Sequence, residues 1–162
     1  MNSVIARVKE HLEDRGLTNV TSKTEDTLAF QTRTSSGLAF VMVTSRETSL
    51  AVLASFGIDV SSDRKCDVLE FLNSVNAVLA RGFFVIASDR VYFRLSMPFQ
   101  SEMELTDERL EQELFGPTFA INDFFHPGLL MVLHGKMSPQ EASDAVLSSQ
   151  EKEPTDTFLN RN

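Results

Sequence analysis

The sequence predicts an α+β fold in which an antiparallel sheet is flanked by helices, in the order α-β-β-β-β-α-β-β-α-α. Apolar residues recur with the 3.6-residue period of a helix near the N-terminus, and then with period two from residue 17 to residue 56. Turn clusters at residues 25–26, 34–37 and 46–47 separate the alternating stretches. This series is typical of an antiparallel meander, which a helix, a hairpin and two further helices then follow.

The first predicted helix runs from Asn2 to Arg15, presents a narrow apolar stripe and stops at Gly16. Four predicted strands follow it, at residues 18–23, 28–33, 38–44 and 50–56.

Two of these strands, residues 38–44 and 50–56, carry apolar side chains on both faces. Helices can cover one face of an antiparallel sheet, so the other face needs a further helix, a curled sheet or a second subunit, or it stays an exposed apolar patch. We therefore expect apolar residues of this meander to make a protein contact. Val41 and Val43 are the candidate contact residues.

A helix between Asp63, a suitable N-cap, and Gly82 is predicted from apolar residues at helical spacing. Residues 83–97 then predict two strands joined by a turn. Asn76 lies on the apolar side of this helix, where a buried amide without partners costs about 1–3 kcal/mol. We expect Asn76 to be a structural polar residue that bonds to the backbone of a neighbouring loop or strand.

Thr106 is expected to cap a third helix, which the Gly-Pro pair at residues 116–117 should kink or divide. Residues 138–141 (Ser-Pro-Gln-Glu) have the pattern of a capping box and predict a last, short helix. Residues 148–162 are polar and aperiodic. We therefore expect one domain over residues 1–147 and a disordered polar tail over residues 148–162.

The overall charge limits the partners. The chain carries a formal net charge of −8, with no cluster of lysine or arginine in the sequence, so a nucleic acid and an anionic membrane are not expected partners. Cys66 is the one cysteine, which excludes an internal disulfide. No apolar run approaches the roughly 20 residues that span a bilayer. These features predict a cytoplasmic protein.

Residue patterns for catalysis and for metal or cofactor binding are missing from the sequence. His126 and His134 lie eight residues apart with a Pro-Gly pair between them, which is not the spacing of a helical metal pair. No glycine-rich phosphate loop or nucleophile elbow is present. The acidic stretch at residues 102–113 can grip a cation or a basic peptide, or can be a solvated helix start. We expect no metal, no cofactor and no catalytic residue.

Several ordered stretches resemble the YbjN-like bacterial proteins, and together they span roughly residues 3–147. They are VLEFLNSVN (68–76), GFF (82–84), VYFRL (91–95), LT (105–106), FFHP (124–127) and GKMSPQEA (135–142). The resemblance implies a fold similar to the type III secretion chaperones, which often form homodimers. It implies no catalytic residues, and a role as a regulator of sensory transduction or as a chaperone-like binding module.

The expected function is therefore that of a non-enzymatic protein-binding module. It would hold a protein partner or a second copy of itself, and would act in the regulation of bacterial signalling or stress response. The alternative is a small-molecule binder or a small enzyme. Such a protein would have a pocket between helix and sheet, and a closed pocket where Asn76, His126 or Tyr92 converge would favour this alternative.

Overall fold

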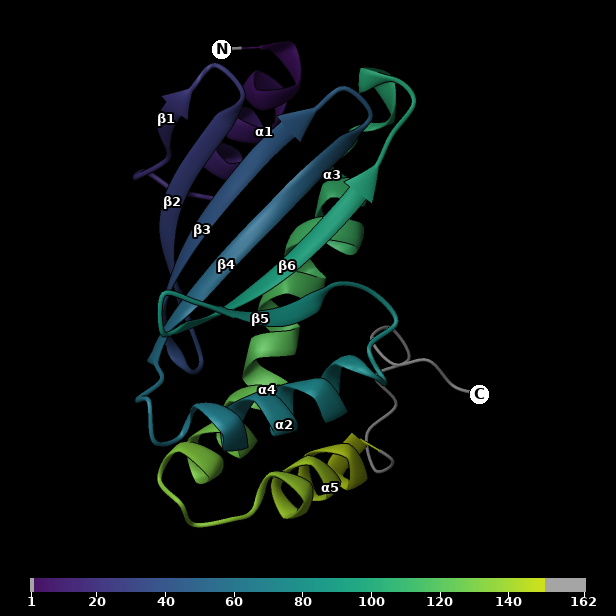
Figure 1. Cartoon of the computed structure of the whole chain (residues 1–162). Helices are drawn as coiled ribbons and strands as arrows, with labels where there is room; N and C mark the ends of the chain where they lie inside the picture. Colours follow the sequence, from purple (N-terminus) through teal and green to yellow (C-terminus); the bar gives the residue numbers. More distant parts are fainter. Residues whose placement is uncertain (1, 151–162) are drawn as a thin grey trace.

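The sheet has six antiparallel strands, which lie side by side in the order β1-β2-β3-β4-β6-β5 (Figure 1). The computed structural model describes residues 2–150 of the chain. Consecutive strands pair as hairpins except at β4, which pairs with β6 and leaves β5 at the edge of the sheet. The strands are β1 (Thr21–Thr24), β2 (Thr27–Thr34), β3 (Gly37–Arg46), β4 (Ser49–Asp59), β5 (Phe83–Ala87) and β6 (Arg90–Pro98).

Within residues 2–150, the helices leave one face of the sheet uncovered. In Figure 1, α1, α3 and α4 lie behind the sheet, and α2 and α5 pack beside α4 at its lower end. The element order is the one predicted from the sequence. The helical segments are α1 (Ser3–Asp14), α2 (Lys65–Asn76), η1 (Glu102–Glu104), α3 (Asp107–Leu110), η2 (Glu111–Phe115), α4 (Gly116–Leu133) and α5 (Pro139–Gln150).

The helical run that begins at α3 passes through the Gly-Pro pair without a break. A π-helical turn, η2, joins α3 to α4 directly before Pro117. Proline has no backbone N–H to donate, and an irregular turn accommodates it where a regular α-helix would lose a hydrogen bond. A Cβ at Gly116 would lie 2.8 Å from the carbonyl oxygen of Glu111, so this turn also needs glycine. The predicted interruption is thus a local π turn within one continuous run.

The face of the sheet that meets the helices forms the core. Val41 and Val43 belong to it, since their exposed fractions are 2% and 0%. The expectation that these two valines lie on an accessible surface is therefore wrong, because β3 directs them toward the helices. Full burial of side chains of this kind stabilises a fold by about 1.5–3 kcal/mol each. The buried residues of the four central strands include Leu28, Phe30, Ala39, Val41, Val43, Leu50, Val52, Ala54, Phe93 and Leu95.

Asn76 makes the backbone contact that the sequence predicts. Its side-chain amide donates to the carbonyl oxygen of Phe84 at 2.9 Å, and its Oδ1 accepts from the Phe84 N–H at 2.7 Å. The helix ends at Asn76, earlier than the predicted end at Gly82, and residues 77–82 form the connection to β5. The two hydrogen bonds fasten the end of α2 to this edge strand. The N-cap residue is Arg64 instead of Asp63.

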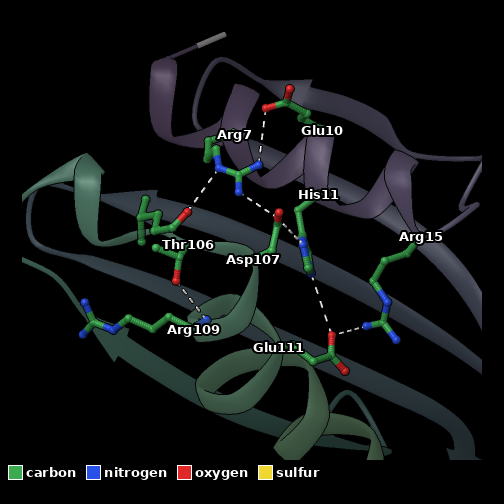
Figure 2. A network of polar contacts seen from close by, with 9 residues as sticks. Arg7, Glu10, His11, Arg15, Thr106, Asp107, Arg109 and Glu111 are labelled. Carbon is green, nitrogen blue, oxygen red and sulfur yellow. Dashed lines mark hydrogen bonds and ion pairs between the residues drawn. The ribbon is translucent and has the colours of Figure 1, made fainter.

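A network of polar contacts attaches α1 to the helical run that begins at α3 (Figure 2). Arg7 donates to Asp107 at 2.7 Å, and Nδ1 of His11 lies 2.7 Å from the same carboxylate. Arg15 pairs with Glu111 one turn further on. The hydrogen bond from His11, followed by that from Arg7, holds the pKa of Asp107 below its usual value. These contacts fix α1 against the covered face of the sheet.

The last helix, α5, begins with the predicted capping box. The Ser138 N–H donates to Glu141 Oε2 at 2.9 Å, and the Glu141 N–H donates to Ser138 Oγ at 3.3 Å. The helix extends to Gln150, beyond the domain end predicted at residue 147. The first three residues of the predicted tail, 148–162, therefore belong to α5, and residues 151–162 lie outside the described part of the chain.

Candidate functional site

The uncovered side of the sheet, here called the open face, carries large apolar side chains. Leu38, Phe40 and Met42 of β3 are 44%, 43% and 43% exposed, and Phe83 of β5 is 45% exposed. Charged and small residues normally occupy the solvent side of a sheet, and an accessible apolar patch usually marks a contact surface. The residues of the open face include Thr21, Lys23, Ala29, Gln31, Arg33, Leu38, Phe40, Met42, Thr44, Arg46, Ala51, Leu53, Ser55, Phe83, Val85, Arg90, Tyr92 and Arg94.

The pairing register brings these side chains together. Residues directly opposite each other on neighbouring antiparallel strands project from the same face of the sheet. Met42 of β3 is opposite Leu53 of β4, and Leu53 is opposite Arg94 of β6. Tyr92 is opposite Val85 of the edge strand β5. The open face is therefore one continuous surface that crosses β2, β3, β4, β6 and β5.

Two hollows lie on the open face. The first has a volume of about 500 Å³ and the second about 470 Å³. Both are lined by Met42, Leu53 and Tyr92, so these three side chains form a ridge between them. The first hollow extends over β2 to Lys23 of β1, and the second extends toward β5. A partner would have to fit around the ridge and place a side chain on each side of it.

The charge on the open face is opposite in sign to that of the chain. No Asp or Glu is among the residues that line the two hollows, whereas Lys23, Arg46, Arg90 and Arg94 all line them. The guanidinium of Arg94 also lies 5.7 Å from the centre of the Phe83 ring. The open face is thus apolar at its centre and basic around it, in a chain with a formal net charge of −8.

The sequence-based prediction named contact residues on the buried side of β3. Val41 and Val43 lie behind the sheet, and the residues that alternate with them form the open face. The cross-strand register contains the signal that separates the two sides. Leu53 is opposite Arg94, and the polar alternation of Tyr92 and Arg94 in β6 marks the side that faces solvent.

The three residues named for a pocket between helix and sheet do not converge. Tyr92 lines the hollows of the open face, and neither Asn76 nor His126 lines them. Asn76 is engaged with the backbone of Phe84, and His126 lies within α4. Burial lowers the pKa of His126 from its usual value, and Asp123 opposes that shift. A separate hollow of about 380 Å³ does lie between α1, β2 and α4.

The remaining histidines have positions in the scaffold. His134 is the C-cap residue of α4, as its place before Gly135 suggests. His11 is buried and belongs to the network that attaches α1 to α3 and η2 (Figure 2). Within residues 2–150, no three His, Cys, Asp or Glu side chains are gathered so that they could hold a metal ion.

These features define a class: an α+β protein with a six-stranded antiparallel sheet, helices on one face and an accessible apolar face on the other. The model of the YbjN family, described as "Putative bacterial sensory transduction regulator", matches residues 5–114. The match covers more than half of the chain, so the chain belongs to the YbjN family. The family is described as a regulator and not as an enzyme.

A solved structure aligns with nearly the whole chain. It is that of YbjN, described as "a putative transcription regulator from E. coli", with 13% sequence identity and a TM-score of 0.45. The alignment covers 97% of this chain and 96% of that chain. No curated protein matches the sequence. Across the described residues, none of the helices has the length and apolar character needed to cross a bilayer.

Proposed function

We propose that the chain is a non-enzymatic protein-binding module of the YbjN family, and that it binds its partner through the open face of the sheet. The partner is a second protein or a second copy of this chain, and the binding serves regulation of bacterial signalling or stress response. A chaperone-like mode of action and a cytoplasmic location belong to the same proposal. The description of the family as a regulator supports this class of function.

The observation that carries the proposal is the exposure of Leu38, Phe40 and Met42 in a strand whose opposite face is fully packed. Removal of apolar surface from water is worth roughly 25 cal/mol per Å². The fold itself gains this stabilisation only in part, because the three side chains stay 43–44% exposed, and the helices of the described residues lie on the other side of β3 (Figure 1). A partner that covers them would gain it.

A small-molecule binder is the second candidate function. The two hollows, of about 500 and 470 Å³, fall within the roughly 300–1,000 Å³ range of ligand sites. Both lie on a sheet surface, whereas apolar ligand sites typically enclose most of their ligand. This difference makes the small-molecule binder the second candidate. A screen of small molecules by thermal shift separates the two functions, since a ligand of these hollows would raise the melting temperature of the chain and lose that effect in Leu53→Glu.

The test of the proposal compares substitutions on the two sides of the molecule. Phe40→Glu and Met42→Glu place a charge on the open face, and Leu69→Glu places the same charge on an apolar side chain of α2 that is 40% exposed. We expect the open-face variants to lose a complex that the parent chain and Leu69→Glu retain. The measurements are light scattering of the purified chain and affinity capture from the native host, read by mass spectrometry.

A second copy as partner would appear as a parent dimer that Phe40→Glu converts to a monomer. A different protein as partner would appear as a captured chain that Phe40→Glu no longer holds. A monomeric parent whose captured proteins are unchanged in both open-face variants would contradict the proposal.

A further inference from the structure

We propose that the occupant of the open face is an acidic segment of a partner protein, with apolar side chains that enter the two hollows and carboxylates that pair with the basic residues around them. This inference rests on the proposed function and specifies the chemistry of the partner. Its strongest support is a difference between the basic residues of the open face and those of the rest of the molecule.

Four basic residues of the open face lack acidic partners, whereas Arg90, which lines the first hollow, pairs with Asp59 at 2.8 Å. Among residues 2–150, no carboxylate lies within ion-pair distance of Lys23, Arg33, Arg46 or Arg94. Apart from Lys136, every other lysine and arginine of these residues has an ion pair. The sequence has 23 acidic and 15 basic residues, so the missing partners are not explained by a shortage of carboxylates.

The position of these cations fits a contact with an anionic partner. Lys23 lines the first hollow, and Arg46 and Arg94 line the second. Each therefore lies beside apolar surface that a partner would cover. Charges at the edge of such a surface steer an oppositely charged partner and fix its register, and they repel a like-charged one. An acidic segment with apolar side chains would cover the apolar surface and pair its carboxylates with these cations.

A second copy fits the open face less well. In a two-fold dimer the same patch meets itself, so the cations around one hollow would meet the cations of the partner copy. No Asp or Glu lines either hollow to offset that repulsion. The charge on the open face therefore favours a different, acidic protein over a symmetric dimer through this surface.

A single-stranded nucleic acid is the other anionic macromolecule that a sheet can bind, through bases that stack on aromatic rings. The open face carries three aromatic side chains, those of Phe40, Phe83 and Tyr92, among aliphatic ones that give no stacking surface to a base. The formal net charge of −8 also repels a phosphate backbone over the rest of the molecule. A peptide is therefore the favoured occupant.

The test uses an array of amphipathic peptides in which the apolar positions are constant and the remaining positions are Glu, Gln or Lys. Labelled peptides from the array and a labelled oligouridine are titrated into the full chain by fluorescence anisotropy. We expect the Glu series to contain the tightest binders, with an affinity that falls as sodium chloride is raised. We expect the Lys series and the oligouridine to bind more weakly than the Glu series.

Variants then identify the surface. Arg46→Gln and Arg94→Gln should each weaken the acidic peptide about two- to fivefold, as expected for ion pairs at the edge of an interface. Arg94→Lys should restore most of the affinity. Lys136→Gln is the matched control, because Lys136 also lacks an ion pair among the described residues but lies in the connection between α4 and α5. It should leave the affinity unchanged.

The possible results separate this inference from the proposed function. Binding that Phe40→Glu abolishes but that the arginine variants and the Glu-to-Gln exchange in the peptide leave unchanged would overturn the acidic partner and keep the protein-binding face. Tighter binding of the Lys series or of oligouridine, or no binding by any peptide of the array, would also overturn it. Peptide binding that is indifferent to both Phe40→Glu and the arginine variants would overturn both proposals.

Discussion

The two faces of β3 differ in burial although both are apolar. On the covered face, where Figure 1 shows the helices, Ala39, Val41 and Val43 are buried. On the open face, the larger Leu38 and Met42 stay accessible. The fold could place polar residues there without loss of packing, because no element of the described chain covers them. The comparison shows that apolar patterning in this strand builds the core on one side, and on the other side it supports the proposed contact.

The charges of the molecule divide in a similar way. Arg7, Arg15 and Arg109 pair with carboxylates of α3, η2 and their surroundings, and these ion pairs join elements of the scaffold to one another. Arg46 and Arg94 on the open face have no ion pair within the described residues, although Arg94 lies over the ring of Phe83. Ion pairs therefore join the elements of the covered side, and the open side carries unpaired cations beside one ion pair, Arg90 with Asp59.

The largest effect is expected from a charge at adjacent positions of β3. Val43→Asp buries a carboxylate without a partner and should lower the free energy of unfolding by roughly 3–5 kcal/mol. Met42→Asp, one residue away on the open face, should lower it by less than about 1 kcal/mol. Urea denaturation followed by circular dichroism measures both. Equal losses in the two variants would contradict the assignment of the two faces.

A smaller effect is expected where α2 is fastened to the edge strand of the sheet. Asn76→Ala removes the hydrogen-bond partners of the Phe84 N–H and carbonyl oxygen. It should lower the free energy of unfolding by about 2 kcal/mol, because buried polar groups are then left unsatisfied. Asn73→Ala, an exposed position on the same helix, is the matched control and should stay within about 0.5 kcal/mol of the parent. Urea denaturation of the two variants provides the measurement. A parent-like Asn76→Ala would show that these hydrogen bonds do not hold the covered side together.

The smallest expected effect is on the stability of the fold at acidic pH, through the contacts that attach α1 to α3. The pKa of Asp107 is lowered by hydrogen bonds from His11 and Arg7, so its ionised form is favoured in the folded state. Its contribution to stability is therefore present above the unfolded-state pKa, near pH 4, and is lost as the pH falls through the lower folded-state value. Urea denaturation at a series of acidic pH values measures the free energy of unfolding. This free energy should fall less steeply with decreasing pH in Asp107→Asn than in the parent.

The control for this pH series is Glu47→Gln, which removes one negative charge from the turn between β3 and β4. If the free energy of unfolding falls as steeply with decreasing pH in Asp107→Asn as in the parent, Asp107 does not contribute to the acid sensitivity of the fold.

Sequence patterns predicted the elements better than the side of the sheet that each residue occupies. The period-two alternation located the strands, and the capping box at Ser138 located α5. Alternation could not assign the faces of β3, because both are apolar and the choice depends on which strands lie beside it. That choice follows from the pairing of Leu53 with Arg94, a contact between residues far apart in the sequence.

Two local features also depended on tertiary structure. The end of α2 at Asn76 follows from its hydrogen bonds to Phe84, which compete with continuation of the helix to Gly82. The π turn before Pro117 accommodates a Gly-Pro pair that would otherwise break a helix. The unpaired cations of the open face could not be recognised from composition, since the chain as a whole is acidic.

Photo-crosslinking in the native host tests most directly whether the open face is the binding surface. A benzophenone amino acid placed at position 40 projects from the open face, and the same residue at position 69 projects from α2 with similar exposure. Irradiation should yield a covalent adduct with a partner protein from position 40 and none from position 69. An adduct from position 69 alone, or equal adducts from both positions, would contradict the assignment of binding to the open face.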